Sequence, residues 1–229
     1  MGTIVEQCVP PLEAGDKLTR AEFLRRWEAH PEINKAELLG GIVFMPSPLS
    51  VEHGEMDSDI GLWLGTYRVT TPGTASGHNT TSFILEETPQ PDLNLRILPE
   101  YGGSSRKEGK YLAGRPELLA EVCPSSASYD LHAKLELYEA ARIPEYLAVL
   151  LYEQEVRWHV LVGRRYQLLS PDRHGLLRSR VFPGLWLDSK ALLASNIQQV
   201  LARLQEGLHS PEHKRFIAKL ARRKRAGKP

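Results

Sequence analysis

The stretch PDLNLRI, at residues 91–97, decides how the middle of this chain folds. Its apolar and polar side chains alternate, which predicts a strand, and Asp92 stands at the start of that strand. The run LLAEVC at 118–123 predicts a second strand, and Glu121 lies inside it between apolar neighbours. The sequence therefore places one carboxylate on each of two strands.

A helix follows these strands. In YDLHAKLELY, at 129–138, apolar residues recur at helical spacing, which predicts a helix from Tyr129 to Arg142 that ends before Pro144. Lys134 projects from this helix, and as a helix-surface residue it is expected to contribute little to stability. The chemistry-bearing residues thus occur in the order Asp, Glu, Lys.

The remaining segments predict an α/β domain with a mixed central sheet flanked by helices. The expected elements are a helix at 19–29 that begins with a capping box of Thr19 and Glu22, two strands joined by a Gly-Gly turn at 36–45, a helix capped by Ser50, a strand at 82–86, a hairpin at 145–162, short strands near 165–169 and 178–182, and helices at 191–205 and from Pro211 onward. Residues 99–115 contain four glycines and several charges, which predicts a mobile surface loop.

Composition limits the class of protein. With 229 residues, 41% apolar and 25% charged, we expect one soluble domain at 18–190, an extension at 1–17, and C-terminal helices with a basic tail at 191–229. Cys8 and Cys123 are too few and too different in context for a disulfide framework or a zinc site, which favours the cytoplasm. No apolar run approaches the roughly 20 residues of a membrane span, so we expect no membrane anchor.

The formal net charge of +1 conceals an asymmetry. Eight of the 29 basic residues lie at 214–229, where there is no acidic residue, so 21 basic residues face 28 acidic ones in the rest of the chain. A basic tail can contact phosphates by counterion release. It can equally be a frayed, solvated helix end. Both interpretations stay open at the level of sequence.

The order of Asp92, Glu121 and Lys134 fits the hydrolysis of a phosphodiester. That reaction needs a hard cation, a water made nucleophilic beside it and a positive group near the phosphate. Carboxylates on neighbouring strands can hold the cation, and a buried glutamate is costly unless a metal or a cation compensates it. Simpler interpretations exist: Asp92 only starts a strand, Glu121 pairs with a core arginine, and Lys134 pairs with Asp130 on the helix surface. The three residues together favour a metal-dependent hydrolase.

Three quoted segments carry a resemblance. PDLNLR at 91–96, LLAEVCPSSASYDLHAKLELYEAARIPEYL at 118–147 and GRRYQLLSPDRHGLLRSRVFPGLWLD at 163–188 resemble the Uma-type putative restriction endonuclease family, a branch of the PD-(D/E)XK nuclease superfamily. The similarity extends from about Leu18 to Leu220. It implies a restriction-endonuclease-like mixed sheet flanked by helices, with a helical C-terminal extension, and a divalent-metal site.

The resemblance also assigns site residues. Asp92 takes the place of the PD aspartate and Glu121 that of the second acid, and together they would hold the metal. Cys123 stands where the superfamily has its lysine, and branches of this kind place that lysine on the following helix, at Lys134 here. Glu37 matches the early catalytic glutamate of the family, although it can also be an edge-strand charge.

Accessory residues follow from the same resemblance. His53 matches the early histidine, although a helix-surface histidine is the simpler interpretation. Tyr129 and Asp130 would support the start of the helix, and His132 would lie beside the metal ligands.

The implied activity is that of a Mg²⁺- or Mn²⁺-dependent endodeoxyribonuclease that hydrolyses DNA. A homodimer with C₂ symmetry is expected, because one-site enzymes commonly cleave duplexes in pairs and the hairpin at 145–162 offers strand edges and exposed aromatics. Two alternatives stay open. The fold can be a catalytically silent nucleic-acid-binding or structural protein, which the acidic body favours, or the substrate can be RNA or a nucleotide-derived small molecule.

Overall fold

The computed structural model describes residues 9–45, 49–125 and 129–226, without the side chains of 129–131. Its centre is a six-stranded mixed sheet in the order β11-β10-β9-β8-β5-β3. The strands are β3 (Thr74–His78), β5 (Leu93–Ile97), β8 (Leu118–Cys123), β9 (Glu145–Leu150), β10 (Glu155–Val162) and β11 (Arg165–Leu168). β8 and β9 are parallel, and the other neighbours in this sheet are antiparallel. The predicted α/β fold with a mixed central sheet is confirmed.

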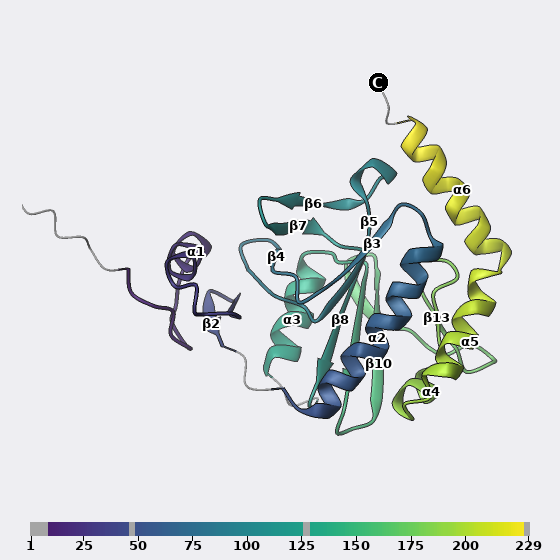
Figure 1. The fold of residues 1–229 in the computed structure, drawn as a ribbon, viewed down its shortest axis with the longest axis horizontal. Coiled ribbons are helices and arrows are strands. Elements are labelled where there is room, and N and C mark those ends of the chain that lie inside the picture. Colours follow the sequence, from purple (N-terminus) through teal and green to yellow (C-terminus); the bar gives the residue numbers. More distant parts are fainter. Residues whose placement is uncertain (1–8, 46–48, 126–128, 227–229) are drawn as a thin grey trace, which may run out of the picture.

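Helices cover both faces of this sheet (Figure 1). The helices on one face are α2 (Val51–Thr70), α4 (Ser189–Leu193), α5 (Ile197–Leu208) and α6 (Pro211–Ala226), and α3 (Tyr129–Ala140) covers the other. Every residue of β8 and β9 is buried, as is typical of central strands with both faces covered.

Two apolar cores result, one on each face of the sheet. The larger one joins Trp63 of α2 and Leu95 of β5 to Leu204 of α5 and Leu220 of α6, so the C-terminal helices pack into the main core. The smaller one lies under α3 and contains Leu119, Tyr138 and Tyr146 among other residues. The candidate site lies beside this smaller core, where the sheet has polar side chains among the apolar ones.

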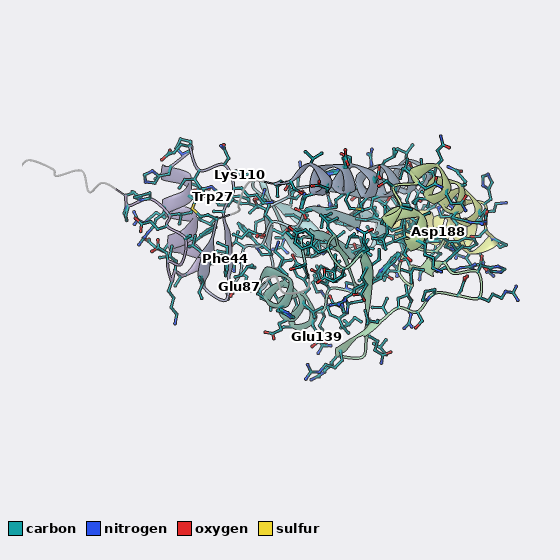
Figure 2. All side chains as sticks on the ribbon, turned by 90° about the horizontal axis from the view of Figure 1, so that it is seen from below. Trp27, Phe44, Glu87, Lys110, Glu139 and Asp188 are labelled. Atoms are coloured by element: carbon teal, nitrogen blue, oxygen red, sulfur yellow. The ribbon has the colours of Figure 1, made fainter. Side chains whose placement is uncertain are left out.

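A lobe at one end of the molecule contains α1 (Arg20–Ala29), β1 (Glu37–Leu39) and β2 (Ile42–Phe44). Figure 2 shows Trp27 and Phe44 at this end and Asp188 at the other. Thr19 caps α1 as predicted, and Ser50 caps α2. Gly40 and Gly41 have φ angles of 62° and 72°, the positive values that a two-residue hairpin turn between β1 and β2 requires.

The prediction of a surface loop at 99–115 is wrong. After a short helix, η1 (Pro99–Tyr101), the chain forms a hairpin of β6 (Ser104–Glu108) and β7 (Tyr111–Arg115) with five paired positions. Four of the five side chains of β6 are exposed and mostly charged, so the strand has no apolar alternation to reveal it. β4 (Ser82–Phe83) joins β7, and it is shorter than the predicted strand because Leu85 turns the chain with a φ of 52°.

Other elements differ in smaller ways. β3 was not predicted, because it lies in a stretch rich in glycine and proline. The helix expected at 191–205 is divided at Ser195, whose φ is 53°, and Asn196 caps its second part, α5. A two-stranded pair, β12 (Leu177–Arg178) and β13 (Trp186–Leu187), precedes it.

The hairpin at 145–162 is confirmed as β9 and β10, but its aromatics are largely inside. Tyr146 and Trp158 are fully buried, because helices cover both sheet faces, and Tyr152 in the turn is exposed. β11 pairs along the edge of β10, so β10 is not an edge strand. Within the described residues, no helix is long and apolar enough to cross a membrane.

Candidate active site

Asp92 and Glu121 meet at one end of the ladder between β5 and β8. Leu93 of β5 pairs with Ala120 of β8, and the same register one step further sets Asp92 opposite Glu121. Directly opposite residues of an antiparallel pair point to the same face of the sheet. The Val122 N–H donates to Asp92 Oδ2 at 3.0 Å, which ties the aspartate to β8. Both carboxylates are buried.

Lys134 lies against this pair. Its Nζ is 3.0 Å from Glu121 Oε1 and 3.1 Å from Glu37 Oε1, and its side chain is only 7% exposed. The expected helix-surface position is therefore wrong. α3 packs on the sheet with the face that carries Lys134, so the lysine is surrounded by protein and its charge is balanced by carboxylates.

Glu37 reaches the site from β1. The backbone N–H of Gln90 also donates to its Oε1, and Leu38 is joined to Thr88 by a pair of backbone hydrogen bonds. These contacts hold the lobe containing β1 against the chain that leads into β5. Glu37 is buried and ion-paired, not an exposed edge-strand charge.

Two further side chains approach Asp92. His53 of α2 is buried, with Nε2 at 3.4 Å from Asp92 Oδ2, so it is not a surface histidine. Lys35 Nζ lies 3.7 Å from Asp92 Oδ1 and donates to Asn79 Oδ1 at 3.1 Å. Its side chain is 24% exposed, which marks the side where the site meets solvent.

Sequence reasoning missed Lys35 and Tyr138. The Tyr138 hydroxyl donates to Glu121 Oε1 at 3.2 Å. Tyr138 follows Lys134 by four residues, and this spacing places both on one helix face, so helical periodicity could have identified Tyr138. Lys35 lies in an irregular segment before β1, and no local pattern marks it.

Of the other predicted accessory residues, His132 is the one whose side chain the structure describes, and it is not brought to the site. His132 is exposed on α3. The side chains of Tyr129 and Asp130 lie outside the described part of the chain, as does Cys8. Cys123, at the position of the superfamily lysine, is buried at the end of β8.

The site contains more carboxylates than positively charged side chains. Burial opposes ionisation of Asp92, but the hydrogen bonds from His53 and Val122 and the attraction of Lys134 outweigh it and lower the aspartate's pKa. Burial raises the pKa of Glu121, and Asp92 and Glu37 add repulsion that the attraction of Lys134 does not offset. Burial opposes the charge on Lys134, yet Glu121 and Glu37 raise its pKa.

The donor set suits a hard divalent cation. Among the described side chains, no three His, Cys, Asp or Glu residues lie close enough together to hold an ion by themselves. Mg²⁺ typically binds through one or two carboxylates and keeps several waters. Asp92 and Glu121 provide two such carboxylates on one face, and the excess of acid favours a cation there. The residues fit the metal that the resemblance implies.

Comparisons with known proteins agree with this fold. A search of curated proteins found no match. A crystal structure of a putative nuclease belonging to DUF820, from Anabaena variabilis ATCC 29413, has a similar fold, with a TM-score of 0.55 and 15% sequence identity over 82% of this chain and 99% of that one. The model of the Uma2 family, described as putative restriction endonuclease, matches residues 20–190. This match spans most of the chain, which therefore belongs to the Uma2 family.

Proposed function

We propose that the protein is a divalent-metal-dependent endonuclease that hydrolyses DNA phosphodiester bonds. Its family supports a nuclease. The observation that carries the finer proposal is the juxtaposition of Asp92 and Glu121 across one strand ladder, with Lys134 Nζ 3.0 Å from Glu121 Oε1. Two carboxylates and one cation in a buried corner are the groups that phosphodiester hydrolysis requires.

Asp92 and Glu121 would hold Mg²⁺ or Mn²⁺. A bound divalent ion neutralises charge on the phosphate and lowers the pKa of a bound water. The Val122 N–H and His53 fix the orientation of Asp92, and Tyr138 fixes that of Glu121. These contacts come from three different elements, so the carboxylates are oriented before any ion arrives.

Lys134 would stabilise the charge that develops on the phosphoryl oxygens. Glu37 is a second carboxylate partner of its Nζ, which would keep the cation in place while Glu121 is engaged with a metal. Preorganised charges of this kind act strongly in a site that excludes water. Lys35, partly exposed beside Asp92, marks the side from which a phosphate would approach.

Cleavage and metal binding test the proposal together. Purified protein is incubated with plasmid and linear duplex DNA, and with duplex RNA, in Mg²⁺, Mn²⁺, Ca²⁺ or EDTA. Mn²⁺ binding is measured separately by calorimetry. We expect DNA cleavage in Mg²⁺ or Mn²⁺ only, and loss of both cleavage and Mn²⁺ binding in Asp92→Asn. Cleavage in EDTA, or wild-type cleavage by Asp92→Asn, would contradict the metal site. Cleavage of RNA alone would identify a ribonuclease.

The assembly is part of this proposal. A C₂ homodimer would bring two copies of the site to the two strands of a duplex. The chain has a mass of 25.8 kDa, and light scattering at micromolar concentration should give twice this value. A monomeric mass with and without DNA would refute the dimer.

A further inference from the structure

The C-terminal helix is anchored to the globule. His213 Nε2 lies 2.9 Å from Thr71 Oγ1, and its Nδ1 lies 2.8 Å from the Leu208 carbonyl oxygen. Phe216 and Leu220 are buried in the main core. α6 is therefore fixed at least as far as Leu220.

Beyond this anchor the helix is strongly basic. Five cations are exposed along its carboxyl-terminal half: Lys219, Arg222, Arg223, Lys224 and Arg225. Within the described ranges, the ion pair on α6 is that of Arg215 with Glu212, and none of the five cations has a carboxylate within ion-pair distance. Their positive charge is thus available to an external partner.

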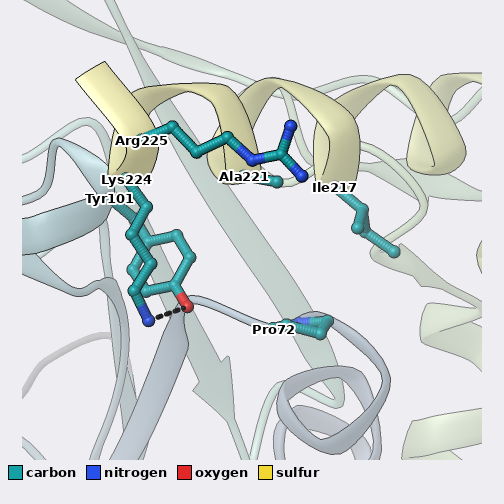
Figure 3. Close-up of a pocket in the computed structure, with 6 residues that line it drawn as sticks. All are labelled: Pro72, Tyr101, Ile217, Ala221, Lys224 and Arg225. Carbon is teal, nitrogen blue, oxygen red and sulfur yellow. Dashed lines mark hydrogen bonds between the residues drawn. The ribbon is translucent and has the colours of Figure 1, made fainter. Parts of the chain in front are cut away.

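Two of these cations are held against η1. Lys224 Nζ lies 4.8 Å from the ring centroid of Tyr101 and 3.0 Å from its hydroxyl (Figure 3). Arg223 covers Gly102, where an added Cβ would lie 3.0 Å from the Arg223 Cδ. The packing extends the anchored region of α6 into its basic half.

A pocket of about 290 Å³ lies between the helix and this turn. Its lining consists of Pro72, Tyr101, Ile217, Ala221, Lys224 and Arg225, which Figure 3 draws. The lining combines apolar side chains and an aromatic ring with two basic side chains from the last turn of the helix. A concave surface with cations and an aromatic ring suits the sugar-phosphate backbone of a nucleic acid.

We propose that the carboxyl-terminal half of α6, together with Tyr101, is a second nucleic-acid-binding surface, separate from the candidate active site. η1 follows the carboxyl end of β5, whereas Asp92 precedes its amino end. The five residues of β5, at about 3.4 Å each, separate the two regions by about 17 Å along the strand. The choice of nucleic acid as ligand rests on the proposed function, because a nuclease must hold its polymer.

The alternative polyanion, an acidic lipid surface, fits less well. Helices that lie on membranes present apolar side chains beside their cations. On α6 the large apolar residues Phe216 and Leu220 are buried in the core, and Ile217, which lines the pocket, is partly buried. The cationic surface therefore offers little to insert into lipid, whereas phosphate contact needs only the charges.

The test is DNA binding in EDTA, where no metal-dependent cleavage occurs. The variant combines Arg222→Gln, Arg223→Gln and Arg225→Gln, which removes three exposed charges and keeps good helix formers. Its affinity for a fluorescent 20-base-pair duplex is measured by anisotropy over a range of salt concentrations. We expect at least about tenfold weaker binding and a salt slope reduced by up to about 2.7, since each lost phosphate contact contributes about 0.9.

A matched control removes three exposed charges elsewhere, with Arg164→Gln, Arg173→Gln and Lys190→Gln. It should keep the wild-type affinity and salt slope, and Mn²⁺ binding should be unchanged in both triple variants. Equal losses in the two variants, or none in the α6 variant, would overturn the inference. Loss of binding to phosphatidylserine vesicles with unchanged DNA binding would overturn it in favour of lipid. If the wild type never cleaves but the α6 variant alone loses DNA affinity, the proposed activity fails and this surface stands.

Discussion

Two buried glutamates on adjacent parallel strands differ in what surrounds them. Glu145, at the start of β9, is fully buried and accepts hydrogen bonds from the Ser179 hydroxyl at 2.8 Å and from the N–H groups of Arg180 and Val181 at 2.6 and 3.1 Å. Glu121, on β8, faces the cation of Lys134 and two other carboxylates. Burial raises the pKa of both. The two glutamates therefore share a raised pKa but differ in the charge of their neighbours, which is why the proposed site includes Glu121 and not Glu145.

The largest expected effect is on DNA cleavage, which should depend on Glu121 and not on Glu145. Asp92→Asn or Glu121→Gln should reduce DNA cleavage by at least about 10²–10³-fold, because each removes a ligand of the proposed metal or its charge. Glu145→Gln should change the rate per folded molecule less than about twofold. Single-turnover cleavage in saturating Mg²⁺ measures all three.

Circular dichroism must first show that each variant is folded. A Glu145→Gln protein that is folded but inactive would show that the site extends to β9. A fully active Glu121→Gln would remove the distinction between the two glutamates.

Lys134 offers the next largest effect. Lys134→Ala should lower the free energy of unfolding by about 3–5 kcal/mol, because it leaves Glu37 and Glu121 buried without their cation. Adding Glu121→Gln to this variant should restore part of the loss, since one uncompensated charge is removed. Urea denaturation measures both.

The matched lysine is Lys190, exposed on α4, whose replacement by alanine should leave stability unchanged. Wild-type stability in Lys134→Ala would mean that the lysine is not the partner that keeps this site charged. Cleavage should fall in Lys134→Ala even under conditions where the variant is folded.

The pH dependence of stability tests the comparison through Glu145. Burial raises its pKa to about 7 from an ordinary value of 4.5. The folded state then binds the proton more tightly than the unfolded state, so this contribution to stability is complete below about pH 4.5 and is lost as the pH rises to about 7. Over this pH range the free energy of unfolding should fall by about 3 kcal/mol.

Glu145→Gln cannot titrate, so the stability difference between wild type and variant should depend on pH over this window. Urea denaturation between pH 4.5 and 8 measures it. A difference that stays constant with pH would mean that Glu145 is ionised throughout, held by its three donors.

The sequence predicted the parts of the fold that have strong periodicity or clear caps. α2, α3, β5 and β8 follow from apolar spacing, and Thr19 and Ser50 cap the helices that they were expected to cap. β6 and β7 could not be predicted in this way, since most side chains of β6 are exposed and charged, the buried residues of β7 are adjacent and do not alternate, and backbone pairing forms the hairpin.

The site could be predicted only in part for a similar reason. Asp92, Glu121 and Lys134 follow from their order and from family resemblance. The burial of Lys134 depends on how α3 is rotated against the sheet, and the position of Lys35 depends on a lobe that is held by long-range contacts. No local pattern contains this information.

The smallest expected effect concerns the orientation of Glu121. Tyr138→Phe removes the hydroxyl that donates to Glu121 Oε1 and should cost about 1 kcal/mol of stability. Tyr166→Phe is the matched control, because its hydroxyl donates to the Ile143 carbonyl oxygen at 2.8 Å and has no contact with the site. Both variants should lose similar stability. Only Tyr138→Phe should weaken Mn²⁺ binding in calorimetry, by a fewfold, since Glu121 is then free to rotate away from Asp92. Equal Mn²⁺ affinity in the two variants would show that Lys134 alone fixes Glu121 and that Tyr138 only fills the core.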